Sequence, residues 1–168
     1  MKNIYLIGFM ASGKTTVGQI LAEKLNKEFV EMDHVVIARS GIPVKEIFKK
    51  LGEIEFRRLE KELLQEISKR TDIILSCGGG LACDNENREL LKATGNVVYL
   101  SASNTILHER IRQIKVRALQ PVDNQEKALD KLMDLRKPFY EQAHLTVVTD
   151  ALTPDAVADA IIKAFPAT

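Results

Sequence analysis

The sequence predicts an α/β fold in which a parallel β-sheet carries helices on both faces. Short apolar runs alternate with amphipathic stretches from one end of the chain to the other, as expected where helices connect parallel strands. A glycine-rich motif follows the first apolar run and precedes the first amphipathic stretch. The length of 168 residues suits one domain with a sizeable core and is too short for two ordinary domains.

The strands are predicted from five short apolar runs. The first run, Ile4 to Ile7, is cut short by a glycine, which is typical of a buried strand. We expect the strands to cover residues 4–7, 29–32, 73–75, 96–100 and 145–149. Because such sheets bind ligands at the carboxyl ends of their strands, residues that follow these runs are candidates for a functional site.

The helices are predicted from apolar residues that recur at helical spacing. We expect helices over residues 16–25, 43–51, 53–69 and 156–165, with further helical segments in the remaining gaps. In the longest of these, Phe56, Leu63 and Ile67 lie on one apolar stripe. Pro43 falls in the first turn of its helix, where proline is tolerated.

The composition excludes several classes of protein. Hydrophobic residues make up 45% and charged residues 28%, which fits a globular protein and argues against wholesale disorder. With 24 Lys and Arg against 23 Asp and Glu, the formal charge of +1 predicts no nucleic-acid or membrane partner. No apolar stretch approaches the ~20 residues of a membrane span, and no signal peptide is evident, so we expect a cytoplasmic protein. Cys77 and Cys83 form no CxxC motif, which argues against a zinc site.

Residues Gly8 to Thr15, GFMASGKT, match the phosphate-binding pattern G-x-x-x-x-G-K-[ST] at every fixed position. The glycines allow the backbone to wrap around phosphate oxygens, and the following helix contributes its positively polarised N-terminus. Lys14 is expected to reach the β- and γ-phosphates, and the Thr15 hydroxyl is expected to bind Mg²⁺. The motif therefore predicts a nucleoside triphosphate with a metal, but it does not identify the acceptor.

Two carboxylates, Glu31 and Asp33, occupy alternate positions at the end of the second predicted strand. In an extended segment both side chains would point the same way, toward the phosphate loop. One could hold metal-bound water while the other accepts a proton from an attacking hydroxyl. A solvated acidic strand end explains the pattern equally well.

Two further segments carry candidate ligands for an acidic substrate. Arg57 and Glu60 are three positions apart on the long helix, so Glu60 could orient an arginine that binds a carboxylate. The alternative is an exposed ion pair. Residues Gly78 to Gly80 follow the third strand and would let backbone N–H groups approach a ligand closely, although a tight turn has the same composition.

Residues 110–117 are basic and contain no aromatic residue, so a lid over phosphates fits them better than a nucleic-acid surface. A solvated helix end is an equally good interpretation. Farther along, Pro138 follows Arg136 by two positions within an expected helix. A local break there could turn Arg136 inward, and an ordinary helix boundary is the alternative.

In this order, the segments resemble the shikimate kinase family. The resemblance covers nearly the whole chain and rests on the segments GFMASGKTTVG, EMD, GEIEFRRLE, SCGGG, VRALQP and RKPFYEQA. The phosphate loop is common to many families, whereas FRRLE followed by a strand and GGG, and then by RxPxYxxA, is far more specific. The resemblance implies transfer of the γ-phosphoryl group of ATP to the 3-hydroxyl of shikimate, with Mg²⁺, in the pathway to aromatic amino acids.

The resemblance also implies an architecture. The family has a three-layer P-loop kinase fold with a five-stranded parallel sheet of order 2-3-1-4-5. It would give this chain a single domain over residues 1–168, with a substrate-binding helical region at about 33–61 and a mobile lid at about 111–123. We expect a monomer whose partners are ATP and shikimate.

The resemblance assigns roles to residues of this chain. The expected catalytic residues are Asp33 (the base), Lys14 and Arg117. The expected shikimate-binding residues are Asp33, Arg57, Gly79, Gly80 and Arg136. The expected nucleotide-binding residues are Ala11, Ser12, Gly13, Lys14, Thr15, Thr16, Arg110, Arg117 and Pro154. The expected metal-binding residues are Thr15 and, through water, Glu31.

The chain departs from the family pattern at four places. Glu31 stands where aspartate is usual, and Ala118 stands where the lid usually has proline. Ala11 replaces a common loop glycine and is expected to resist a positive φ. Residues 149–151 lack the Asn-Arg pair often found beside adenine, which leaves Pro154 as the expected contact there.

Two other functions stay open on the sequence alone. A different small P-loop kinase, such as a gluconate or nucleoside monophosphate kinase, could also use Arg57 and Arg136. A module that binds nucleotide without transfer is the non-catalytic alternative. The presence of both Asp33 and Lys14 argues against that module, since binding alone needs no base.

Overall fold

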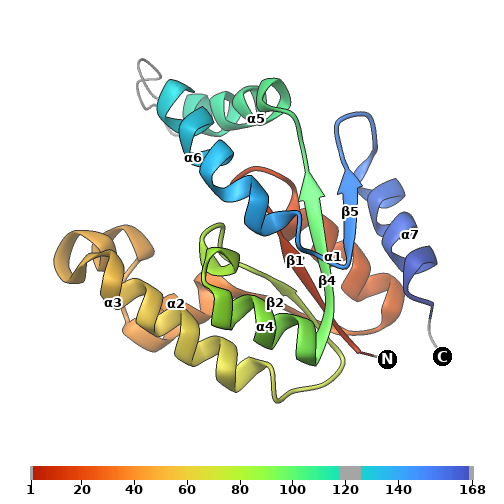
Figure 1. Ribbon diagram of the computed structural model, residues 1–168, viewed down its shortest axis with the longest axis horizontal. Coiled ribbons are helices and arrows are strands. Elements are labelled where there is room, and N and C mark those ends of the chain that lie inside the picture. The colour runs from red at the N-terminus through yellow and green to blue at the C-terminus, as the bar shows by residue number, and fades with distance from the viewer. Residues whose placement is uncertain (1, 118–125, 167–168) are drawn as a thin grey trace.

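Five parallel strands form one sheet in the order β2-β3-β1-β4-β5, seen at the centre of Figure 1. The computed structural model describes residues 2–117 and 126–166, with the side chains of residues 115–117 excluded. The strands are β1 (Asn3–Ile7), β2 (Glu28–Glu31), β3 (Ile73–Ser76), β4 (Gly95–Ser101) and β5 (Leu145–Val148). The predicted α/β class and strand order are therefore confirmed.

Helices cover both faces of the sheet (Figure 1). They are α1 (Lys14–Leu25), α2 (Met32–Ser40), α3 (Val44–Ile67), the short 3-10 helix η1 (Leu81–Cys83), α4 (Asn85–Thr94), α5 (Asn104–Arg117), α6 (Glu126–Tyr140) and α7 (Pro154–Ala164). None of the helices in the described ranges has the length and apolar character needed to cross a membrane.

Alternation along the strands builds two separate cores. On one face, Leu6 and its neighbours on β3 and β4 pack against α1 and α7. On the other, Tyr5 and Ile7 belong to a core that includes side chains of α2 to α6. Since successive strand residues point to opposite faces, β1 is buried on both sides and carries no exposed residue. The loop that follows β1 therefore starts from a strand that is packed on both faces of the sheet.

The end of β2 differs from the prediction. The strand stops at Glu31, and Met32 begins α2, so the expectation that Glu31 and Asp33 alternate along an extended segment is wrong. Met32 and Val36, one helical turn apart, are both completely buried, and this packing stabilises the helix. Asp33 instead occupies the first turn of α2, where a carboxylate interacts favourably with the helix dipole.

The two helices predicted on either side of Gly52 are two arms of the bent element α3. Gly52 has φ +84° and ψ 170°, so the helical path is interrupted there. That φ lies in the left-handed region, which glycine adopts at little cost. The bend directs Phe56, Leu63 and Ile67 into the core beneath the sheet.

Candidate active site

The phosphate loop connects β1 to α1. Gly13 precedes the helix with φ +97°, and its carbonyl accepts the first helical hydrogen bond from Val17 at 2.9 Å. Ala11 adopts φ +61° even though an L-residue resists that conformation, at a cost of about 1 kcal/mol. The loop therefore keeps its curved path where the family usually has glycine.

Lys14 points back into the loop that precedes it. Its Nζ donates hydrogen bonds to the carbonyl oxygens of Gly8 at 2.9 Å and Phe9 at 2.8 Å. Burial lowers the pKa of Lys14 to about 8, and the opposing charges of Glu31 and Asp33 restore only part of it. A triphosphate bound in the loop would place negative charge beside the ammonium group of Lys14 and favour its protonated form.

Nucleotide binding is expected to take up protons at Lys14. Near pH 8, with a pKa of about 8, roughly half of the free protein carries a neutral Lys14, whereas a bound triphosphate favours the charged form. The affinity for MgATP should therefore be constant below that pH and should fall as the pH rises through it. Calorimetric titrations at pH 8 in buffers of different ionisation enthalpy should show uptake of about half a proton, rising toward one proton at higher pH.

A Lys14→Arg variant is the control for that titration, because arginine stays charged throughout this pH range. It should bind MgATP without proton uptake. Equal proton uptake by the wild type and this variant would assign the titration to another group.

The oxygen atoms beside Thr15 fit a divalent cation. The Thr15 hydroxyl donates a 2.7 Å hydrogen bond to a carboxylate oxygen of Glu31. Ser76 lies opposite Glu31 in the strand pairing, and its buried hydroxyl oxygen has no partner among the described residues. Hydroxyl, carboxylate and phosphate oxygens together with water are the ligands that Mg²⁺ prefers. Glu31, although longer than the usual aspartate, reaches Thr15.

A cavity of about 480 Å³ extends from the phosphate loop to α5 and to the loop before α7. It is lined by all the predicted nucleotide-binding residues whose side chains the structure describes; the Arg117 side chain is outside them. Arg110 Nη1 donates to the Ala11 carbonyl at 3.2 Å, which connects α5 to the loop. Ile114 and Leu152, two exposed apolar residues that our sequence interpretation missed, also line the cavity, as Pro154 does. Apolar side chains around a cavity are typical of sites that hold a flat ring.

A second group of residues surrounds the glycine loop after β3. The Arg57 guanidinium lies against Gly80, where a Cβ atom would overlap it. The Arg136 guanidinium lies near Gly79, with Nη1 3.4 Å from the position that a Cβ would take. Asp33 Oδ1 lies 3.7 Å from the corresponding position at Gly78. A side chain at Gly80 would displace the Arg57 guanidinium, and the fold brings together residues that are far apart in the sequence.

Glu60 orients the side chain of Arg57. It is only 1% exposed, one of its oxygens accepts from Arg57 Nη1, and the other has no partner among the described residues. Burial raises the pKa of Glu60, although the Arg57 charge opposes this. Burial acts to lower the pKa of Arg57, but the Glu60 carboxylate outweighs it and holds that pKa above its usual range. Arg57 therefore stays charged and is presented toward the glycine loop.

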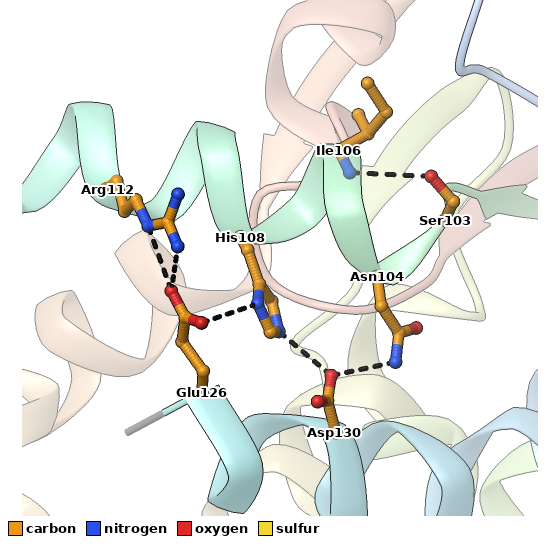
Figure 2. A network of polar contacts seen from close by, with 7 residues as sticks. All are labelled: Ser103, Asn104, Ile106, His108, Arg112, Glu126 and Asp130. Atoms are coloured by element: carbon orange, nitrogen blue, oxygen red, sulfur yellow. Dashed lines mark hydrogen bonds and ion pairs between the residues drawn. The ribbon is translucent and has the colours of Figure 1, made fainter. Parts of the chain in front are cut away.

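A polar network connects the amino-terminal half of α6 to α5 (Figure 2). His108 Nε2 lies 2.9 Å from Asp130 Oδ1, and its Nδ1 lies 3.6 Å from Glu126 Oε2. Arg112 Nε donates to Glu126 at 2.9 Å, and Asn104 donates to Asp130 at 2.8 Å. This network was not predicted, although basic and acidic residues repeat at a spacing of four on the two helices. It links the helix of Arg110 to the helix of Arg136.

The expected lid and the expected break before Pro138 have different outcomes. The predicted lid at 111–123 lies in α5 as far as Arg117, and the rest of it, with the Arg117 side chain and Ala118, lies outside the described residues. Helix α6 continues through Pro138 and ends at Tyr140, so the interpretation of a break before Pro138 is wrong. Pro138 lacks the N–H that would bond to the Asp134 carbonyl, and the helix ends two residues later.

The family profile described as shikimate kinase matches residues 10–166. The chain belongs to the shikimate kinase family. The shikimate kinase of Thermodesulfovibrio yellowstonii is 41% identical over 165 residues, which span 98% of this chain and 95% of the relative. That of Legionella pneumophila strain Corby is 40% identical over 97% of this chain and 94% of the relative. The family resemblance predicted from the sequence is thus confirmed.

Solved structures agree with the family assignment. Shikimate kinase from Acinetobacter baumannii in complex with shikimate has a TM-score of 0.89 at 39% identity, with coverage of 98% of this chain and 92% of that chain. A gluconokinase from Sinorhizobium meliloti has a TM-score of 0.62 at 21% identity, over 97% and 92% of the two chains. The gluconokinase therefore shares the fold alone.

Proposed function

We propose that this protein transfers the γ-phosphoryl group of ATP to the 3-hydroxyl of shikimate, giving shikimate 3-phosphate and ADP in the pathway to aromatic amino acids. The observation that carries the proposal is that a complete phosphate loop faces two guanidinium groups across one glycine loop. The Acinetobacter baumannii relative, whose structure contains shikimate, supports the choice of acceptor.

In this proposal the carboxylate of shikimate binds between Arg57 and Arg136. Planar guanidinium groups match a carboxylate with paired hydrogen bonds, and Glu60 keeps Arg57 in place. The backbone of Gly79 and Gly80 then borders the ring closely because no Cβ intervenes. This arrangement would hold the 3-hydroxyl at one position relative to the phosphate loop.

Asp33 is the proposed base. As the 3-hydroxyl oxygen bonds to the γ-phosphorus, its proton passes to Asp33, while the bond from that phosphorus to the bridging oxygen breaks and ADP leaves. Lys14 stabilises the charge on the transferred group, and Arg117 is proposed to do so from the lid. Bound Mg²⁺, held by Thr15 and through water by Glu31, would neutralise phosphate charge.

A substrate panel tests the proposal. Purified protein with MgATP should release ADP with shikimate, and much less with gluconate or with nucleoside monophosphates, in a coupled ADP assay. Turnover with gluconate but not shikimate would assign the chain to another small-molecule kinase. Nucleotide binding without turnover on any acceptor would favour a binding module. The cytoplasmic location and the monomeric state stay predictions.

A further inference from the structure

Arg88 on α4 holds the short helix that follows the glycine loop. Its Nη1 donates to the carbonyl oxygens of Ala82 and Cys83, each at 2.9 Å. Its Nη2 donates to Asn85 Oδ1 at 3.0 Å. Because η1 begins directly after Gly80, these contacts fix the downstream side of the glycine loop.

The same guanidinium also contacts the carboxyl-terminal end of α6. Arg88 Nε donates to Gln142 Oε1 at 3.2 Å, and its Cζ lies 4.9 Å from the centre of the Phe139 ring. A cation over an aromatic face is an attractive arrangement. One side chain therefore joins two segments that are far apart in the sequence, and each of them borders the proposed shikimate site.

The setting of Arg88 is costly for a residue that serves only packing. The side chain is 8% exposed, and no carboxylate of the described residues pairs with it. Its hydrogen-bond acceptors are all neutral oxygens. Buried charges without counter-charges are unfavourable, and an apolar side chain of similar volume is often at least as stable in such a place. What an apolar residue cannot provide is a directional connection between η1 and α6.

The two connected segments carry the two sides of the proposed carboxylate site. Gly79 and Gly80 precede η1, whereas Arg136 and Tyr140 lie on the last two turns of α6. The Tyr140 hydroxyl donates to the Gly79 carbonyl, which is a second connection between the same segments. Arg88 and Tyr140 thus approach the junction of glycine loop and α6 from two directions.

We propose that Arg88 is a positioning residue that sets the distance between the glycine loop and Arg136, and thereby the affinity for the acidic substrate. The inference rests on the proposed function, since it takes Arg57 and Arg136 to bind the carboxylate of shikimate. Arg88 touches neither substrate; it acts through η1 and the end of α6.

Steady-state kinetics of an Arg88→Met variant test whether Arg88 sets the affinity for the acidic substrate. Methionine keeps much of the volume and removes the charge and all five donors. We expect the KM for shikimate to rise at least about tenfold, as for the loss of one charged hydrogen bond, with the KM for ATP nearly unchanged. Arg88→Lys keeps the charge but not the planar fork, so it should recover only part of the loss. The control is Arg70→Met, a half-exposed arginine paired with Glu28, which should leave both constants unchanged.

Amide hydrogen exchange tests the connection without any substrate. In Arg88→Met, exchange should speed up at residues 81–85 and 136–143 and stay as in the wild type in α1 and α7. Should Arg88→Met fail to fold, Gln142→Leu, at an exposed position just past α6, removes the hydrogen bond from Arg88 Nε but leaves the Phe139 contact in place. It also removes the bond from Gln142 to the Pro138 carbonyl, so the weaker change in exchange that decides the matter is the one at residues 81–85.

Three outcomes decide the matter. A shikimate KM that stays at the wild-type value, with only kcat or the active fraction reduced, would overturn the positioning role. Unchanged exchange in both segments would overturn it as well. Absence of shikimate turnover by the wild-type protein would instead overturn the proposed function, and the exchange data would still decide whether Arg88 connects η1 to α6.

Discussion

An Asp33→Asn variant is expected to bind nucleotide normally and to lose roughly 100- to 10,000-fold in kcat with shikimate, the range for removal of a general base. Asparagine has nearly the same shape but cannot accept the hydroxyl proton. Asp33 lies beside Gly78, and its charge opposes the burial that lowers the pKa of Lys14. It thus lies near both the glycine loop and Lys14, where the proposed mechanism puts the acceptor hydroxyl.

The loss of negative charge at a helix start needs its own control. Glu86 occupies the first turn of α4 as Asp33 occupies the first turn of α2, and its side chain is 77% exposed. Glu86→Gln should keep wild-type kcat in the coupled ADP assay. Near-wild-type turnover by Asp33→Asn would refute the base assignment. A large loss of MgATP affinity in that variant would place the role of Asp33 at the phosphate loop instead.

The parts of the site that could be predicted from the sequence are those encoded locally. The phosphate loop is contiguous, so its residues and their chemistry follow from one motif and its place between a strand and a helix. The bend in α3 was predictable because Gly52 separates two apolar patterns that do not continue one another. No local sequence pattern predicts that Arg57 and Arg136 both lie beside the glycine loop, and only the family resemblance suggested it.

The parts that could not be predicted depend on tertiary packing. The run Met32 to Ile37 contains three β-branched residues and resembles a strand, but burial of Met32 and Val36 on one side makes it a helix. Arg88 lies in an ordinary amphipathic helix, and its partners at Phe139 and Gln142 come from a distant segment. No periodicity distinguishes such a residue from a solvated arginine.

Replacing Arg57 with alanine is expected to weaken shikimate binding far more than ATP binding. Loss of a charge-assisted contact typically costs about 1.5–3 kcal/mol, which corresponds to roughly a 10- to 150-fold rise in Kd. Calorimetric titration with each ligand measures the two losses separately. Equal losses for shikimate and ATP would contradict the assignment of Arg57 to the carboxylate.

The neighbouring arginine is a matched control on the same helix. Arg58 has a 52% exposed side chain and pairs with the surface carboxylates of Glu55 and Glu62. Exposed ion pairs contribute at most about 1 kcal/mol. Arg58→Ala should therefore keep the affinity for both ligands and nearly all of the stability. A comparable loss of shikimate affinity in Arg58→Ala would indicate a general effect of positive charge on α3.

Arg57→Ala should also destabilise the protein, because it leaves the buried carboxylate of Glu60 without its partner. Breaking such a pair costs up to about 3 kcal/mol at neutral pH. Burial already raises the pKa of Glu60, and loss of the Arg57 charge would raise it further. A group with a raised folded-state pKa stabilises at low pH and loses that contribution as the pH rises through the pKa, so the deficit should shrink on acidification. A double variant, Arg57→Ala with Glu60→Gln, should recover stability in urea unfolding but not shikimate affinity, which separates the effect on stability from recognition of the acid.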